Sequence, residues 1–204
     1  MHSCCALFDM DGTIYDSGID FLAIRKHLGL PQNGTPILDQ LGEVSPEDRA
    51  IGLKLLHEAE AAGAANGKLI AGTEKLLSWL KEQGVRSALV TNNSRASVDA
   101  IVGRHPALLF DTILTRDDGI AKPQPDLFLK ALKHFEIQPL QAVAVGDTHL
   151  DALAAHRAGI RKILLVALRD WMSALIPSDV SYQRIESLSA AREHIAGWLS
   201  GHIR

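Results

Sequence analysis

Short runs of apolar residues recur along the chain, and most of them end at a polar or glycine-rich turn. Runs of this length with few polar interruptions are typical of strands that are buried on both faces, as in a parallel sheet. We therefore expect strands at residues 4–9, 86–93, 111–118, 142–147 and 162–168.

Helical patterns separate most of these strands, with apolar residues three and four positions apart. The predicted helices span residues 73–84, 95–105, 124–137 and 149–159. Thr73 is the expected N-cap of the first helix and Gly84 its expected end, because these residue types favour those positions. The alternation of strand and helix predicts an α/β fold with a doubly wound parallel sheet.

One long segment, residues 17–67, breaks this alternation because it contains no predicted strand. We expect it to form a small α-helical cap, inserted after the first strand. The core would then comprise residues 1–16 and 68–204.

Two helices are expected within this insert, at residues 19–30 and 45–63, on either side of a turn rich in Pro, Gly and Asn. Asp16 is expected to begin the first helix. Ser45 is expected to cap the second, with Pro46 in its first turn.

Composition and charge narrow the possible environments of the chain. Its 204 residues are 47% hydrophobic and 22% charged, as in ordinary globular proteins. A formal charge of -3 without a basic block gives no case for binding nucleic acid or an acidic membrane surface.

No apolar run reaches the ~18 residues of a membrane span. No basic segment precedes the first apolar run, so we expect no signal peptide and a cytoplasmic location. Cys4 and Cys5 fit buried thiols in a reducing compartment.

Acidic residues follow two of the predicted strands. Asp9 and Asp11 lie two positions apart, so in extended geometry they share one side, and at ~4 Å they would repel by about 4 kcal/mol. Asp147 ends a later strand, and Asp151 follows four positions on. The carboxyl ends of parallel strands meet at one edge, where these acids can converge around a cation. Hard oxygen ligands suit Mg²⁺.

Groups that suit an anion come from two other segments. Thr91 and Asn92 follow a predicted strand, where a hydroxyl and free backbone N–H groups would hold a phosphate. Lys122 lies in a proline-rich loop, and beside several acids it would serve as a counter-ion for a phosphate. The edge of the sheet therefore combines a predicted metal site with a predicted phosphate site.

In this order the segments FDMDGT, LVTN, KPQPDLF and VGDTHLD resemble the four motifs of the haloacid dehalogenase (HAD) superfamily. The resemblance implies a Rossmann-like core, with Asp9 as nucleophile and Asp11 as acid and base. It places Mg²⁺ on Asp9, Asp147 and the backbone carbonyl of Asp11. Thr91, Asn92, Lys122 and Gly12 would contact phosphate, with Asp151 and Thr13 in support.

Within the superfamily, the helical cap resembles that of the phosphoglycolate phosphatase and β-phosphoglucomutase branch. The Arg-Gly-x-Ser-Arg-like signature of the mutases is absent from the sequence. The resemblance therefore favours a Mg²⁺-dependent phosphatase for a small phosphorylated metabolite. A phosphomutase or other phosphotransferase, and a ligand-binding protein without turnover, remain as alternatives. Asp151 could equally be a first-turn acid that favours its helix dipole, and His149 could line the site.

Overall fold

The structure of the protein, a computed structural model, describes residues 4–202, so residues 1–3 and 203–204 of the expected core lie outside it. A six-stranded sheet forms the centre, with the strand order β5-β4-β1-β6-β7-β8 and parallel pairing throughout. The strands are β1 (Cys5–Phe8), β4 (Arg86–Val90), β5 (Thr112–Leu114), β6 (Ala142–Gly146), β7 (Lys162–Val166) and β8 (Gln183–Ile185). The parallel sheet expected from the apolar runs is confirmed.

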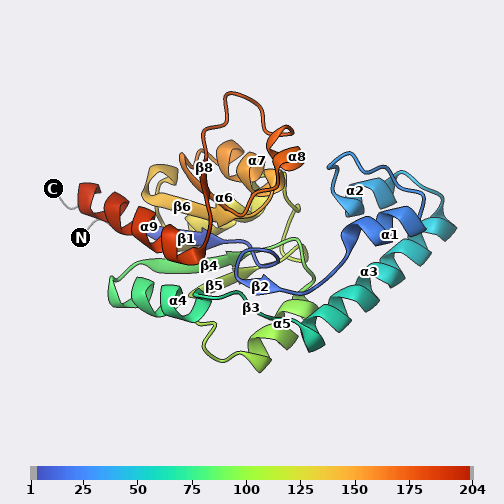
Figure 1. Ribbon diagram of the computed structural model, residues 1–204, viewed down its shortest axis with the longest axis horizontal. Helices are drawn as coiled ribbons and strands as arrows, with labels where there is room; N and C mark the ends of the chain where they lie inside the picture. The colour runs from blue at the N-terminus through green and yellow to red at the C-terminus, as the bar shows by residue number, and fades with distance from the viewer. Residues whose placement is uncertain (1–3, 203–204) are drawn as a thin grey trace.

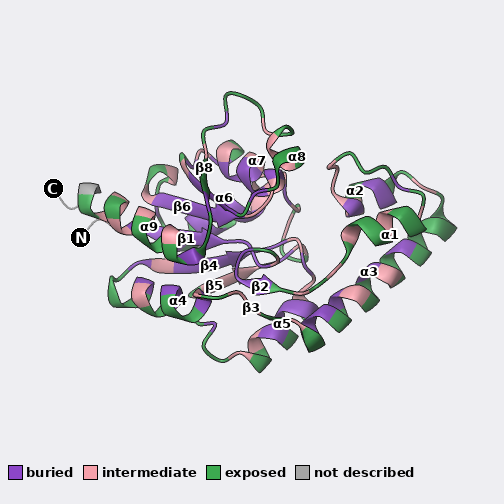
Figure 2. Ribbon diagram, in the orientation of Figure 1, coloured by how far each residue is buried: buried purple, intermediate pink, exposed green. Residues whose placement is uncertain are grey.

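Helices cover both faces of this sheet (Figure 1). The helices α4 (Thr73–Glu82), α5 (Arg95–Arg104) and α9 (Leu188–His202) pack on one face, and α6 (Asp126–Phe135) and α7 (His149–Arg157) on the other. In β1, Ala6 and Phe8 point to the first layer while Cys5 and Leu7 point to the second, and all four are fully buried. Figure 2 shows this buried centre under exposed outer helix faces. The fold is therefore a doubly wound α/β core.

A helical cap projects from one end of the sheet (Figure 1). It comprises α1 (Phe21–His27), α2 (Ile37–Gly42) and α3 (Pro46–Asn66), and it lies between β2 (Tyr15–Asp16) and β3 (Lys68–Leu69). These two short strands pair antiparallel at the base of the cap. The cap has a small core of its own, made of Leu30, Ile37, Leu41 and Leu56.

Two details at the start of the cap differ from expectation. Asp16 does not begin α1, because it lies in β2 and accepts a hydrogen bond from the backbone of Gly18 at 3.1 Å. Asp20 caps the helix by accepting from Ala23 at 2.9 Å. Ser45 does cap α3, as its side chain accepts from the backbone of Asp48. Because Asp16 belongs to the β2–β3 strand pair at the base of the cap, it does not cap α1.

The start of α4 was also predicted wrongly. Its N-cap is Gly72, whose φ of 96° favours glycine, and Thr73 is the first helical residue. The Thr73 hydroxyl instead contacts the Ile14 carbonyl at 2.9 Å, next to the first cap connection. This tertiary contact outweighs the local capping preference.

Several short or C-terminal elements have no prediction to match, among them α2, α8 (Asp170–Ser173), the 3₁₀ helix η1 (Pro139–Gln141), β8 and α9. Two of the three residues of β8 are exposed, so the strand has no continuous apolar run. Helix α9 packs on the sheet through Leu188, Ala191 and Ile195.

Within residues 4–202, no helix has both the length and the hydropathy to cross a membrane.

Candidate active site

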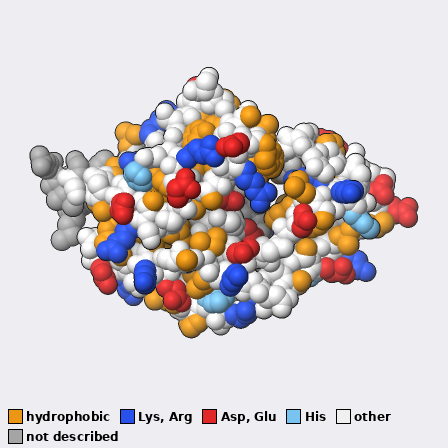
Figure 3. All heavy atoms as spheres, in the orientation of Figure 1, with side chains coloured by type: hydrophobic (Ala, Val, Ile, Leu, Met, Phe, Trp, Pro, Cys, Tyr) orange, Lys and Arg blue, Asp and Glu red, His pale blue; other side chains and the backbone are white. Residues whose placement is uncertain are grey.

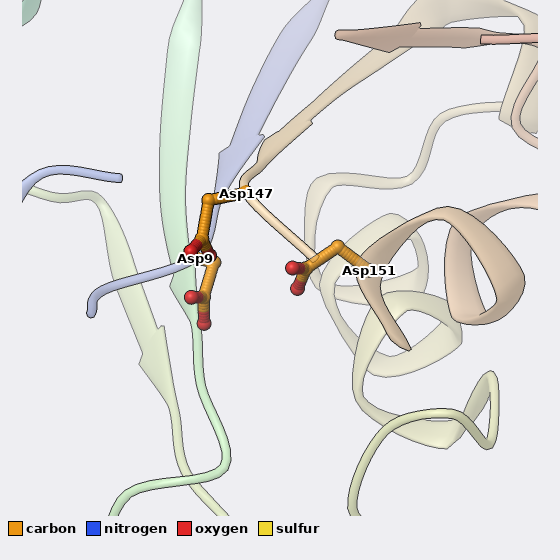
Figure 4. A group of neighbouring side chains, drawn as sticks. All are labelled: Asp9, Asp147 and Asp151. Carbon is orange, nitrogen blue, oxygen red and sulfur yellow. The ribbon is translucent and has the colours of Figure 1, made fainter. Parts of the chain in front are cut away.

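Three aspartates from distant parts of the chain meet at the carboxyl edge of the sheet (Figure 4). Asp9 follows β1, Asp147 follows the adjacent strand β6, and Asp151 lies in the first turn of α7. One carboxylate oxygen of each lies within 4.8 Å of the others. We call these three residues the acidic cluster. The convergence expected from a parallel sheet is therefore present for these side chains.

Lys122 lies inside this cluster and is 3% exposed. Its ammonium group donates to Asp9 Oδ1 and to Asp151 Oδ1, both at 2.5 Å, and to the Val90 carbonyl at 3.0 Å. Three acceptors use all three protons of the ammonium group. Lys122 therefore holds the position of the Asp9 carboxylate.

Asp151 contacts both Lys122 and the first turn of its own helix. One of its oxygens, Oδ1, accepts from Lys122, and the other, Oδ2, accepts from the backbone of Thr148 at 3.0 Å and its hydroxyl at 2.6 Å. The second set of contacts caps the start of α7. The helix start thus fixes Asp151 as an anion that orients Lys122.

Burial and neighbouring charges shift the pKa values of these three carboxyl groups in different directions. Burial raises the pKa of Asp9 to about 7 despite the opposing charge of Lys122. Burial and the neighbouring Asp151 raise the pKa of Asp147 well above its ordinary value. Burial also acts on Asp151, but Lys122 and the Thr148 hydrogen bonds outweigh it and lower its pKa. One lysine cannot compensate three carboxylates, so two of them favour protonation when no other cation is close.

The acidic cluster fits a divalent cation. Oδ1 of Asp147 and Oδ1 of Asp11 are buried and have no hydrogen-bond partner among the described residues. Such atoms are costly unless an ion, a proton or water satisfies them. With three carboxylates and one ammonium group, the cluster carries about two uncompensated negative charges when fully ionised. Mg²⁺ supplies that charge and prefers carboxylate oxygens.

The side chain of Asp11 lies apart from the acidic cluster. Its Oδ2 accepts from the Asn93 side-chain amide at 2.6 Å. Burial raises the pKa of Asp11, opposed by hydrogen bonds from Ser17 and Asn93, and the charge of Glu60 adds to the rise. A raised pKa favours the protonated form of Asp11, which suits a group that donates a proton.

The expected phosphate-binding amides are partly engaged within the protein. The backbone N–H of Thr91 donates to the Leu114 carbonyl at 3.0 Å, and that of Asn93 donates to the Thr91 hydroxyl at 3.2 Å. For Thr91 and Asn93 the expectation of a free backbone N–H is therefore wrong, because sheet pairing uses the first and a local turn uses the second. The buried Thr91 hydroxyl still lines the cavity at this edge.

The Asn92 side chain joins two loops of the site. Its amide nitrogen donates to the Lys122 carbonyl at 2.9 Å, and its oxygen accepts from the Lys122 backbone at 2.8 Å. Both ends of the amide are thus committed to the backbone beside Lys122. Asn92 positions the lysine loop, which the sequence alone did not suggest.

Gly12 and Thr13 form the turn after β1. A Cβ atom on Gly12 would overlap the Asp147 carboxylate, and the residue has a φ of 76°. Thr13 is fully buried, and its backbone donates to the Met10 carbonyl at 3.2 Å. Gly12 therefore permits the close approach of the β1 turn to the acidic cluster.

Replacing Gly12 by alanine is expected to reduce kcat/KM by about 100-fold, since the new methyl group displaces Asp147 as well as straining the backbone by about 1–2 kcal/mol. Gly84→Ala is the matched control. Gly84 has a similar φ of 68°, a Cβ there meets nothing within 4 Å, and the residue lies after α4, outside the set that lines the site. Steady-state kinetics and thermal unfolding of both variants separate the two effects. Equal losses of activity would show that backbone strain, not displacement of Asp147, is responsible.

Three residues that the sequence did not single out for the site also line this edge: Asn93, Glu60 and Arg116. The guanidinium group of Arg116 pairs with the buried carboxylate of Glu60 on α3, and it donates to the Asn92 carbonyl at 3.0 Å. Asn93 is next to Asn92, which the sequence did predict for the phosphate site. Nothing in the local sequence distinguishes Glu60 or Arg116 from ordinary solvent-exposed charges. This ion pair links the cap to the loop that contains Asn92.

A cavity of about 660 Å³ lies between cap and core, with the acidic cluster, Asp11, Thr91 and Lys122 in its lining. We call it the interdomain cavity. The space-filling view shows the molecule hollowed between its two parts (Figure 3). His149 also lines the cavity, as considered from the sequence. A group bound there can contact both the acidic cluster and the cap.

Comparisons with known proteins agree with this architecture. A family model described as haloacid dehalogenase-like hydrolase matches residues 6–165. Phosphoglycolate phosphatase 1 of Pseudomonas aeruginosa is 30% identical over 186 residues, which cover 76% of this chain and 66% of that protein. A haloacid dehalogenase-like hydrolase domain-containing protein of Arabidopsis thaliana is 29% identical, over 78% of this chain and 69% of its own. The crystal structure of a HAD-superfamily hydrolase of subfamily IA from Geobacter sulfurreducens superposes with a TM-score of 0.64 at 24% identity, and covers 95% of each chain.

Proposed function

The chain belongs to the haloacid dehalogenase-like hydrolase family, and from this premise we propose that it is a Mg²⁺-dependent phosphatase for a small phosphorylated metabolite. The observation that carries the proposal is the contact of Lys122 with Asp9 and Asp151 beside Asp147. This arrangement supports Asp9 as a nucleophile that forms an aspartyl-phosphate.

In the proposed first step, a carboxylate oxygen of Asp9 attacks the phosphorus atom of the monoester. The P–O bond to the substrate alcohol breaks, and Asp11 donates its proton to the departing oxygen. The product is an acyl phosphate on Asp9 and a free alcohol. The separate environments of the two carboxyl groups support this division of roles, because Asp9 contacts Lys122 whereas Asp11 contacts Asn93.

In the second step, Asp11 takes a proton from water, and the water oxygen attacks phosphorus. The bond between phosphorus and Asp9 breaks, which releases inorganic phosphate and regenerates the carboxylate. Lys122 and the Thr91 hydroxyl are proposed to stabilise the charge on the transferring group. Each turnover thus consumes one water molecule and returns both carboxyl groups to their starting states.

Asp9, Asp147 and the backbone carbonyl of Asp11 are the proposed Mg²⁺ ligands, with Asp151 in support. The metal ion would offset the repulsion between the Asp9 carboxylate and the phosphate oxygens. The unpartnered Asp147 oxygen and the excess of negative charge support this assignment.

Release of inorganic phosphate from a panel of phosphomonoesters, with Mg²⁺ or with EDTA, tests the proposal. We expect turnover that depends on Mg²⁺. Transfer of the phosphoryl group to a second sugar phosphate, without release of phosphate, would instead identify a phosphotransferase. Tight binding of esters with no turnover across the panel would identify a binding protein.

Stabilisation by Mg²⁺ is expected to grow with pH. Because the pKa values of Asp9 and Asp147 are raised, these groups hold protons at low pH and must lose them to bind a cation. At a concentration of 100 times Kd, Mg²⁺ stabilises by about 2.7 kcal/mol, or roughly 5–10 °C in Tm for a chain of this size. We expect a shift of this order at pH 8 and a much smaller one at pH 5.5.

Thermal unfolding with and without Mg²⁺ at the two pH values makes this measurement, and Asp147→Asn is the variant in which the shift should be lost. A shift of equal size at both pH values would contradict the assignment of these carboxyl groups as ligands.

A further inference from the structure

The interdomain cavity is larger than the catalytic step requires. At about 660 Å³ it falls within the range of roughly 300–1,000 Å³ that is typical of pockets for drug-sized ligands. A phosphate group bound at the acidic cluster, together with a two-carbon acid, would occupy only a small part of it. The remaining volume lies toward the cap, where the alcohol part of a substrate would extend.

One end of the cap is already fixed to the core. The C-terminal half of α3 carries Glu60, whose carboxylate pairs with Arg116 and accepts from the Ser94 hydroxyl at 2.7 Å. One turn further along the helix, the Arg104 guanidinium group donates to the Ala64 carbonyl. These contacts hold the C-terminal half of α3 against the core.

The opposite end of the cap also touches the core. Nε2 of His149 donates to the Gly34 carbonyl at 2.8 Å. A Cβ atom on Gly34 would overlap the Leu175 side chain and lie 3.0 Å from His149 Nε2, so the two surfaces are in close contact. Cap and core therefore meet at both ends of the interdomain cavity, and its volume is measured with these contacts in place.

The walls of the cavity away from the acidic cluster are mainly apolar. They include Phe21, Leu22, Leu38 and Leu56 of the cap, and Trp171 and Met172 of the core. Leu22 and Trp171 are 41% and 43% exposed and both line the cavity, so their apolar surfaces are accessible to a ligand bound there. The centroid of the Trp171 ring lies 6.4 Å from that of the buried His149 ring, with the two rings tilted, so two aromatic groups line the cavity together.

The cationic residue of the cap wall, Arg25, is already engaged within the cap. Its guanidinium group donates to the Thr35 carbonyl at 2.9 Å, the Gln40 side chain at 3.2 Å and the Phe21 carbonyl at 3.4 Å. These hydrogen bonds connect α1 to the loop that leads to α2. On the cap side, the surface that remains for a ligand is mainly apolar, while the exposed Arg169 of the core also lines the cavity.

We propose that the natural substrate is a phosphomonoester with a bulky alcohol that carries a flat ring, and that this ring packs against Trp171 across from the apolar residues of the cap. The proposal rests on the phosphatase activity proposed above and specifies its substrate class. It excludes two- and three-carbon acids and polyols as preferred substrates, because these would leave the apolar walls uncovered. Burial of a ring against an aromatic side chain favours binding through both area and ring contact.

The test compares esters with the same kind of leaving oxygen. Ethyl phosphate and 2-phenylethyl phosphate are both esters of unactivated primary alcohols, so the chemistry of the departing oxygen is closely matched. We expect kcat/KM for 2-phenylethyl phosphate to exceed that for ethyl phosphate by about 30-fold or more, given that a single methylene contributes about 10-fold in an apolar pocket. 2-Phosphoglycolate, assayed beside them, should also fall well below 2-phenylethyl phosphate.

Variants of Trp171 assign the effect to the proposed surface. Trp171→Ala should reduce the ratio of the two kcat/KM values by about 10-fold, while Trp171→Phe should retain most of it because a ring remains. Leu140→Ala is the matched control, since Leu140 is 66% exposed and does not line the cavity. For Leu140→Ala, the ratio of kcat/KM for 2-phenylethyl phosphate to that for ethyl phosphate should equal the wild-type ratio.

The possible results separate this proposal from the one on which it rests. A wild type that hydrolyses ethyl phosphate or 2-phosphoglycolate as well as 2-phenylethyl phosphate overturns the substrate class but leaves the phosphatase function intact. A ratio that Trp171→Ala does not change overturns the role of this surface. Failure to hydrolyse any of the three esters, in the presence of Mg²⁺, overturns both proposals.

Discussion

Asp9→Asn is expected to reduce kcat by about 10⁴- to 10⁶-fold, because the amide lacks the nucleophilic oxygen anion and removing a covalent nucleophile in other hydrolases has costs of this order. The fold should persist. The substitution preserves shape, and it removes one negative charge from a cluster in which burial already raises the pKa of Asp9. Steady-state release of phosphate and a thermal unfolding curve together make the measurement.

Asp99→Asn is a suitable control for this experiment. Asp99 lies on α5, with a side chain that is 64% exposed, and its weak ion pair with Arg95 at 3.9 Å lies on the surface. It should retain wild-type kcat. Substantial turnover by Asp9→Asn, with a normal unfolding curve, would remove Asp9 from the role of nucleophile.

Lys122→Met is expected to affect both catalysis and stability. Loss of the ammonium group removes the cation that holds Asp9 and Asp151, and we expect kcat to fall by about 10²- to 10³-fold. Removing one partner of a buried ion pair typically destabilises by about 3–5 kcal/mol. The exposed Lys130→Met, which removes a surface pair with Asp126 and an exposed hydrogen bond to the Asp118 carbonyl, should cost less than about 1 kcal/mol.

The stability loss in Lys122→Met should depend on pH. Without the lysine charge, burial raises the pKa values of Asp9 and Asp151 above those of the unfolded chain. The folded state then binds more protons, so its stability falls as pH rises through that range. Metal-free protein should therefore lose more stability at pH 8 than at pH 5.5. A loss that is independent of pH would mean that Lys122 acts through packing of its stem.

Most of the core could be predicted from the sequence because the signals were local. Fully buried strands such as β1 and β6 appear as apolar runs, and their parallel pairing brings Asp9 and Asp147 to one edge. The element α2 was not predicted, since its position in a Pro- and Asn-rich stretch gives little helical signal and its burial of Ile37 and Leu41 depends on the other cap helices.

Contacts between distant segments account for what the sequence did not reveal in the site. The pairs Asn93–Asp11 and Glu60–Arg116 join residues 82 and 56 positions apart. Asp11 belongs to a recognisable motif, but nothing in the local sequence indicates which residue its side chain contacts, and Glu60 and Arg116 belong to no such motif. The backbone N–H of Thr91 is used by β5, which depends on the register between strands. Predictions of residue type at strand ends were therefore more secure than predictions of which hydrogen bonds those residues make.

The role of Asp9 can be tested most directly by trapping the aspartyl-phosphate. With p-nitrophenyl phosphate the leaving group needs little protonation, so Asp11→Asn should complete the first step but stall before hydrolysis. We predict a burst of about one equivalent of p-nitrophenolate per enzyme. Acid quenching, borohydride reduction and mass spectrometry of the peptide should then show homoserine at position 9. A burst without modification at position 9, or with homoserine at another aspartate, would contradict the account.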